Sequence, residues 1–180
     1  MEAISHRRLS KALVNHHVSL FRLAFSWCHD KTLAEDLAQQ TLCKALERGH
    51  QLRSLSLIRP WLFQILARCF ADYCRRRSLD CCSDDIGSGV YDPEILFGRV
   101  ARVQRVRSAI GKLSLPQRQV LTLVELEGLT YREVADTLEV PIGTVMSRLS
   151  RARKALRNEL LETEHMAQDA NVVPFKVCDA

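Results

Sequence analysis

The segment PIGTVMSRLSRARKALR, residues 141–157, combines hydroxyl and arginine side chains with apolar ones at helical spacing. Successive residues of a helix are about 100° apart, so side chains of one kind gather on one face. The apolar face consists of Ile142, Val145, Leu149, Ala152 and Leu156. The opposite face consists of Thr144, Ser147, Arg148 and Arg151. Arginine binds guanine edges or phosphates and hydroxyl groups contact either, so this second face is predicted to bind nucleic acid.

A further helix is predicted immediately before this segment, over residues 131–140. Thr130 and Glu133 have the spacing of a capping box at its start, and a short turn around Glu139 and Pro141 follows it. Two helices joined by such a turn are typical of a helix-turn-helix, whose second helix enters the major groove. The basic side chains flanking the polar face are expected to contact phosphates rather than bases: Arg153, Lys154 and Arg157.

The N-terminal half of the chain brings aromatic side chains close to positive charges in the sequence. Trp61 and Phe63 lie between a loop predicted over 47–59 and an arginine cluster at 75–77. The loop contributes His50, Arg53 and Arg59. Proteins bind single-stranded nucleic acid by stacking bases on aromatic rings and attracting the backbone with positive charge. A buried core position is the alternative for the two aromatic side chains, and on composition alone it is the more frequent one.

The charge distribution divides the 180-residue chain into blocks. Residues 1–78 carry a net charge of +7 and residues 101–161 carry +5, whereas 79–100 carry −4 and 162–180 carry −3. Two basic blocks joined by an acidic connector indicate two domains that face polyanions. Glycine, proline and aspartate in the connector favour a linker, and the acidic tail is expected to be disordered.

The hydrophobic pattern predicts an all-α fold. Apolar residues recur at three- and four-residue spacing almost everywhere outside 79–94, and sustained alternation is absent. We predict two small helical domains, residues 1–78 and 101–161, joined by a flexible linker at 79–100 and followed by the tail 162–180. Helix starts are indicated by Thr32 with Glu35 as a capping box, Pro60 and Pro116, and helix ends by Gly49 and Gly128.

Five segments together resemble one protein family. They are LFRLAF (20–25), AEDLAQQTLCKAL (34–46), PWLFQILARCFADYCRRR (60–77), LPQRQVLTLVELEGLTYREVADTLEV (115–140) and PIGTVMSRLSRARKAL (141–156). Over about residues 10–160, the chain resembles the extracytoplasmic-function (ECF) sigma factors of the bacterial sigma-70 family. The last segment alone would fit other helix-turn-helix regulators. The second and third segments point to a sigma factor.

The resemblance implies a subunit that directs core RNA polymerase to specific promoters and has no catalytic activity of its own. It implies that the C-terminal helix-turn-helix binds the −35 element as duplex DNA. Residues 47–77 would recognise the −10 element by capturing an unstacked base, because extruding a base costs a few kcal/mol that pocket contacts convert into specificity. The residues assigned to the −10 element are His50, Arg53, Arg59, Trp61, Phe63, Gln64, Arg68 and Arg75.

The resemblance also implies protein partners. Asp36, Gln39 and Gln40 would dock on the clamp helices of the largest polymerase subunit, and the linker would run along the polymerase toward the RNA exit. An anti-sigma partner, often membrane-anchored in this family, is implied as well. Three positions depart from the residues usual in the family: Gln40 replaces Glu, Gln64 replaces a basic residue, and Arg68 replaces Asn.

Other classes of protein fit less well. A stand-alone regulator would use residues 1–78 for dimerisation or ligand sensing, but it leaves the Asp36–Gln39 face without a role. An enzyme is disfavoured because none of the six histidines lies near a convincing nucleophile or acidic partner, and no phosphate-binding glycine loop occurs. No pair of the seven cysteines has C-x2-C spacing, so we expect no metal site, disulfide framework or cofactor. The adjacent Cys81 and Cys82 are the best candidates for a redox role, and the absence of a signal-like segment predicts a cytoplasmic protein.

Overall fold

The computed structural model describes residues 6–52, 54–80 and 99–169. The N-terminal domain contains α1 (His6–Val14), α2 (His17–Cys28), α3 (Lys31–Glu47), the short 3-10 helices η1 (Gly49–Gln51) and η2 (Leu55–Leu57), and α4 (Ile58–Asp80). The C-terminal domain contains α5 (Arg99–Gly111), α6 (Leu115–Leu121), the π-helix η3 (Thr122–Leu126), α7 (Tyr131–Leu138) and α8 (Ile142–Asp169). The prediction of an all-α fold with two small domains is confirmed.

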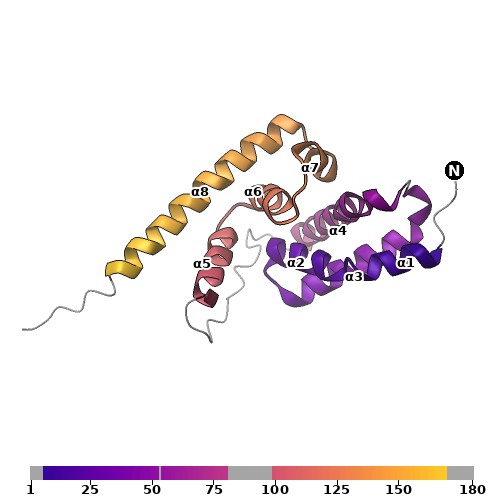
Figure 1. Ribbon diagram of the computed structural model, residues 1–180, viewed down its shortest axis with the longest axis horizontal. Helices are drawn as coiled ribbons and strands as arrows, with labels where there is room; N and C mark the ends of the chain where they lie inside the picture. The colour runs from indigo at the N-terminus through magenta and orange to yellow at the C-terminus, as the bar shows by residue number, and fades with distance from the viewer. Residues whose placement is uncertain (1–5, 53, 81–98, 170–180) are drawn as a thin grey trace, which may run out of the picture.

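The N-terminal domain is a bundle in which α2, α3 and α4 pack on one another (Figure 1). Its buried side chains come from the apolar stripes of these helices: Leu20, Leu23, Trp27, Leu37, Leu62, Leu66 and Phe70. The start of α3 differs from the prediction. Asp30 is the N-cap and its carboxylate accepts from the backbone N–H of Leu33, because the chain turns at His29, which has a left-handed φ of 54°. Thr32 therefore lies inside the helix rather than at its cap.

The segment 47–59 is more ordered than the predicted loop. It folds into η1 and η2, and α4 begins at Ile58, so Pro60 lies in the first turn of α4 as its sequence position indicates. Proline suits this turn because the first helical N–H groups have no intrahelical acceptor. Arg53 lies outside the described residues.

The C-terminal domain contains the predicted helix-turn-helix. Thr130 and Glu133 form the capping box of α7, with the Thr130 N–H donating to Glu133 Oε2 at 2.8 Å. Glu139 ends α7 in the left-handed region with a φ of 55°, and α8 begins three residues later. The predicted end of the preceding helix at Gly128 is also found, since Gly128 has a φ of 68°.

The two domains pack against each other through a buried polar contact. Trp27 is fully buried, and its indole Nε1 donates to Thr122 Oγ1 at 2.9 Å. Arg118 on α6 donates to the Trp27 carbonyl at 2.7 Å and also to the carbonyls of Gly111 and Leu113. The buried apolar side chains of both domains form one continuous cluster. Figure 1 shows the consequence: the α6–α7 end of the C-terminal domain lies against α2 and α4.

The C-terminal end of the chain differs from the expected tail. Helix α8 continues to Asp169, past residue 161 where the second domain was predicted to end. The rest of the tail with Cys178, and the linker residues 81–98 with Cys81 and Cys82, lie outside the described residues. Among the residues that the structure describes, none of the helices combines the length and apolar character needed to cross a membrane.

Replacing Thr122 with valine tests the contact between the domains. The change keeps the side-chain shape but leaves the buried Trp27 indole N–H without an acceptor, which should lower the free energy of unfolding by about 1–3 kcal/mol. Urea unfolding of the full chain measures this effect. Thr41→Val is the matched control, because the buried Thr41 hydroxyl only donates to the Leu37 carbonyl within α3. An equal loss in both variants would contradict a special role for the Trp27 contact.

Candidate nucleic-acid interface

The face of α8 predicted to pack does so along most of its length. Val145, Leu149 and Ala152 are at most 2% exposed, and α8 packs on α6 and α7. On the opposite side, Ser147 and Arg151 are exposed, while Thr144 and Arg148 are half-buried. The Ser147 hydroxyl donates to the Thr144 carbonyl at 3.0 Å, which leaves its oxygen able to accept a hydrogen bond from a ligand. The structure thus brings the four predicted side chains together on one accessible surface.

Two apolar side chains near the start of α8 are exposed. Ile142 was predicted to pack, but 48% of its surface is accessible, because it lies in the first turn of α8, where the neighbouring helices do not cover it. Met146, one turn later, is 53% exposed. Sequence reasoning missed Met146, although its position between the buried Val145 and the exposed Ser147 placed it on the flank. Apolar side chains in such positions can contact thymine methyl groups in the major groove.

The flanking basic residues of α8 differ in their contacts. Arg153 forms two hydrogen bonds to Glu125 Oε1 of η3, at 3.0 and 2.6 Å, so its guanidinium is held against its own domain. The Glu125 carboxylate raises the pKa of Arg153. Lys154 and Arg157 are exposed. Lys154 and Arg157 therefore suit the predicted phosphate contact better than Arg153 does, because Arg153 must release the Glu125 carboxylate before it can bind a phosphate.

The two aromatic side chains predicted for single-strand binding have different surroundings. Phe63 is 1% exposed and belongs to the core, so the prediction that it stacks on a base is wrong for this structure. It occupies the same face of α4 as Leu66 and Phe70, at helical spacing, which explains its burial. Trp61 is half-buried and lines a cavity of about 300 Å³ together with Leu52, Pro60 and Gln64.

Three of the polar residues predicted to face the −10 element are bonded to the C-terminal domain. The Arg59 guanidinium donates to Glu127 Oε2 at 2.9 Å, and Gln64 Nε2 donates to the backbone carbonyl of Asp136 at 3.2 Å. Arg68 forms two hydrogen bonds to Glu139 Oε1, at 2.8 and 2.5 Å. Of the remaining residues predicted for this site, His50 is exposed and Arg75 is paired with Asp72 inside the N-terminal domain.

The titratable groups near this contact respond to burial and to one another. Burial, and then the positive charge of Arg59, lower the pKa of His16. Burial lowers the pKa of His29 too, and the neighbouring Arg118 lowers it further. Hydrogen bonds from the Thr130 backbone N–H and hydroxyl lower the pKa of Glu133. These shifts favour neutral histidines beside the arginines and an ionised carboxylate at the start of α7.

The residues predicted to bind a protein partner lie on α3, away from the contact between the domains. Asp36, Gln39 and Gln40 are exposed, and Gln39 Nε2 donates to Glu35 at 3.3 Å. Asp36 and Gln40 form one wall of a groove of about 560 Å³ between α3 and α4. The opposite wall is formed by Tyr73, Arg76 and Arg77.

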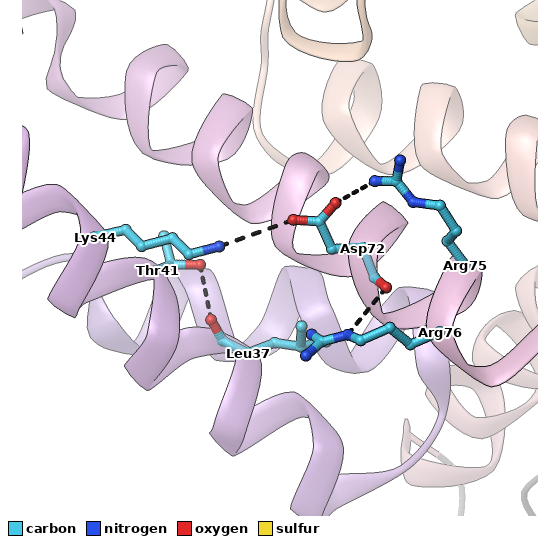
Figure 2. Close-up of polar contacts among 6 residues, drawn as sticks. All are labelled: Leu37, Thr41, Lys44, Asp72, Arg75 and Arg76. Atoms are coloured by element: carbon cyan, nitrogen blue, oxygen red, sulfur yellow. Dashed lines mark hydrogen bonds and ion pairs between the residues drawn. The ribbon is translucent and has the colours of Figure 1, made fainter. Parts of the chain in front are cut away.

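Contacts between α3 and α4 fix the shape of this groove. Figure 2 shows Asp72 of α4 between Lys44 of α3 and Arg75, with Lys44 Nζ 4.0 Å from the Asp72 carboxylate. The Arg76 Nε–H donates to the Asp72 carbonyl at 3.3 Å, which ties the base of the guanidinium to α4. The groove therefore presents acceptors on one wall and positive charge on the other, a pattern suited to a helical partner of mixed charge.

Comparison with protein-family models gives two matches in chain order. Residues 13–79 match the model of sigma-70 region 2, and residues 103–156 match that of sigma-70 region 4. The first match covers the helices around the α3–α4 groove, and the second ends within α8 after Arg151. Both candidate surfaces thus lie within matched regions.

The chain is also similar to individual proteins. It is 34% identical to the ECF RNA polymerase sigma factor EcfG of Rhodopseudomonas palustris, over 77% of this chain and 77% of EcfG. It is 30% identical to the ECF sigma factor SigE of Mycolicibacterium smegmatis, over 88% of this chain but only 63% of SigE. Its fold resembles the sigma factor RpoE of Bartonella quintana, solved with the anti-sigma factor NepR, with a TM-score of 0.72, 31% identity, and coverage of 83% of this chain and 94% of RpoE.

Gly143 provides a test of whether DNA closely approaches the first turn of α8. A Cβ atom added there would meet no atom within 4 Å, so the fold itself does not require glycine. Gly143→Ala should stabilise the protein by up to about 1 kcal/mol, because alanine favours the helix. The added methyl group should at the same time weaken binding to a duplex selected with the wild-type protein, measured by fluorescence anisotropy. Stabilised protein with unchanged duplex affinity would show that DNA does not approach the first turn of α8.

Proposed function

The chain belongs to the ECF sigma factors of the sigma-70 family, and we propose that it directs core RNA polymerase to specific promoters by dividing promoter recognition between its two domains. The observation that carries this proposal is the ordered pair of region 2 and region 4 matches, each of which includes a polar surface separate from the packed core. The polymerase would supply the chemistry of RNA synthesis. This chain would supply recognition only.

In the C-terminal domain, the exposed face of α8 would bind the −35 element as duplex. Arg148 and Arg151 would contact guanine edges or phosphates, and Thr144 and Ser147 would contribute hydroxyl contacts. The exposed Met146 would add an apolar contact on the flank, which favours thymine at the facing position. Lys154 would contact the backbone. Arg153 would join it only after releasing Glu125.

In the N-terminal domain, the surface formed by η1, η2 and the start of α4 would bind the −10 element. Arg59 and Arg68 would hold the backbone of the non-template strand, and Gln64 would contact a base edge. The surface beside Trp61, which α7 also borders in this structure, is a candidate site for an extruded base, with the half-buried indole as its stacking surface. His50 and Arg53 would add contacts from the preceding segment. Arg75 lies farther along α4 and would reach DNA only after leaving Asp72.

The groove between α3 and α4 would bind the polymerase. Asp36, Gln39 and Gln40 are exposed on one side of it, and the family resemblance assigns this face to the clamp helices of the largest subunit. The absence of a suitable membrane span among the described residues is compatible with the cytoplasmic location that promoter binding requires. An anti-sigma protein would be a further partner, as NepR is for RpoE of Bartonella quintana.

A stand-alone regulator remains the competing function, and purified core polymerase distinguishes the two. Core polymerase should co-purify with the sigma factor and should produce defined run-off transcripts from a promoter library only when the chain is present. Stable duplex binding without polymerase association would favour the regulator and would contradict the proposal.

Arg148→Ala and Arg151→Ala test the −35 surface. Each variant should lose about 1–3 kcal/mol of duplex binding if the arginine binds a guanine bidentately, and less if it contacts a phosphate. Core-polymerase binding should not change, because both residues lie on α8 and away from α3. The measurements are promoter binding by the reconstituted holoenzyme and co-purification with core polymerase. Loss of polymerase binding in either variant would contradict this division.

Asp36→Arg tests the α3–α4 groove as the surface that binds the polymerase. The exposed Asp36 lies on the wall of the α3–α4 groove, so charge reversal should weaken polymerase affinity before it affects folding. Lys31→Glu is a suitable control, since Lys31 is an exposed charge in the first turn of the same helix and does not line the groove. Equal polymerase affinity in wild type and Asp36→Arg would count against this surface.

A further inference from the structure

Helix α1 has a basic face that none of the surfaces described above uses. Arg7, Arg8 and Lys11 are exposed, whereas Leu9 and Leu13 are 2% and 3% exposed. At about 100° per residue, the three basic side chains share one face of α1 and the two leucines share the opposite face. The sequence of α1, HRRLSKALV, contains no acidic residue. The match to sigma-70 region 2 begins at residue 13, so the family resemblance assigns no role to this face.

The position of these charges does not stabilise the helix that carries them. Arg7 and Arg8 lie in the first turn of α1, where the helix dipole favours acidic side chains over basic ones. Within the part of the chain that the structure describes, none of the three basic side chains of α1 forms an ion pair. An arrangement that costs stability and has no compensating partner in the fold indicates a ligand outside it.

Helix α1 lies next to the segment that carries the proposed −10 contacts. Leu9 packs so closely on Gly49, the first residue of η1, that a Cβ atom added to this glycine would overlap Leu9 Cδ2. Helix α1 also packs on α3. In Figure 1, α1 and the start of α4 accordingly lie at the same end of the N-terminal domain. Exposed side chains at the junction of α3 and η1 are Glu47, Arg48 and His50.

The spacing of the basic side chains suits a nucleic-acid backbone. Arg7 and Lys11 are four residues apart, so they are separated by about 6 Å along the helix axis. This separation is similar to that of successive phosphates in an extended strand. Arginine and lysine on an open helix face attract phosphates without reading the bases. The face therefore suits the backbone of a single strand that has already been selected elsewhere by its bases.

We propose that the basic face of α1, formed by Arg7, Arg8 and Lys11, binds phosphates of the non-template strand beyond the base captured at the −10 element. This inference rests on the proposed function, because it continues the single-strand site assigned to η1, η2 and the start of α4. The contact adds affinity that does not depend on sequence and that decreases with salt. It holds the melted strand at a second point, so the captured base is not its sole anchor.

Reconstituted holoenzyme and fork-junction DNA test the proposal. Each probe carries a promoter selected with the wild-type holoenzyme, as a duplex that reaches the −10 element. The non-template overhang ends at the −10 element in the short probe and extends about 10 nucleotides beyond it in the long probe. The triple variant Arg7→Gln, Arg8→Gln, Lys11→Gln should bind the long probe about 10- to 100-fold more weakly than the wild type. It should bind the short probe as the wild type does.

The salt dependence of binding counts the contacts. Three phosphate contacts to a single strand contribute about 2 to the slope of log K against log[KCl]. The slope of the triple variant on the long probe should therefore be shallower than that of the wild type by about 2. On the short probe the two slopes should agree. Glutamine favours a helix about as much as arginine and lysine do, and Leu9 and Leu13 are unchanged, so α1 should remain folded.

Lys31→Gln is the matched control for Lys11→Gln. Lys31 is also an exposed lysine of the N-terminal domain, but it lies in the first turn of α3. Lys11→Gln should weaken binding of the long probe several-fold, and Lys31→Gln should leave it unchanged. The double variant Arg7→Lys with Arg8→Lys keeps both charges and should retain wild-type affinity, because attraction to the backbone requires charge rather than base recognition.

A loss confined to the long probe would support the basic face of α1 as a single-strand contact. Equal losses on both probes, or no loss on the long probe, would overturn the inference and leave the proposed −10 site intact. Weaker co-purification of the triple variant with core polymerase would overturn it in favour of a protein partner. A wild-type holoenzyme that selects no promoter from the library would contradict the proposed function itself.

Discussion

The arrangement of the molecule depends on the requirement that a buried indole N–H has an acceptor. Trp27 lies in the core of the N-terminal domain, yet the oxygen that satisfies it, Thr122 Oγ1, belongs to the other domain. Arg118 strengthens the same contact by donating to the Trp27 carbonyl and to two carbonyls near the end of α5. Separating the domains leaves the Trp27 indole N–H and carbonyl without these partners. This loss costs free energy unless water or another ligand takes the place of the partners. The contact therefore fixes how α7 meets α4.

The polar surfaces proposed to bind partners belong to helices that are apolar on one face and polar on the other. One face of α8 packs through Val145 and Leu149, and the opposite face presents Ser147 and Arg151 to solvent. Helix α3 is organised in the same way, with Leu37 buried and Asp36 exposed on the groove wall. Because packing anchors each helix along its apolar face, the polar face is held rigidly without contacts of its own. Rigid presentation lowers the entropic cost of binding.

Helix α4 is the exception, because both of its faces are engaged. Its apolar face holds Phe63 in the core, and its polar face donates through Arg59 and Arg68 to the C-terminal domain. The same guanidinium groups can bind a phosphate or a carboxylate, since each offers two anionic oxygens to the paired N–H donors. Carboxylates of the C-terminal domain, those of Glu127 and Glu139, thus occupy the guanidinium donors of α4 in this structure.

The sequence by itself determined the all-α class and the helix-turn-helix. It also determined the capping box at Thr130 and the two-faced character of α8, because these features depend on spacing within one helix or one turn. Predictions from the sequence failed where packing against other parts of the chain decides the outcome. Phe63 packs inward, Ile142 is not covered by neighbouring helices, and α3 is capped by Asp30 rather than by Thr32. The pairing of Arg68 with Glu139 could not be predicted, since residues 71 positions apart meet only when the domains dock. Local periodicity is encoded along the chain, whereas such contacts depend on which buried groups, such as Trp27, find their partners across the fold.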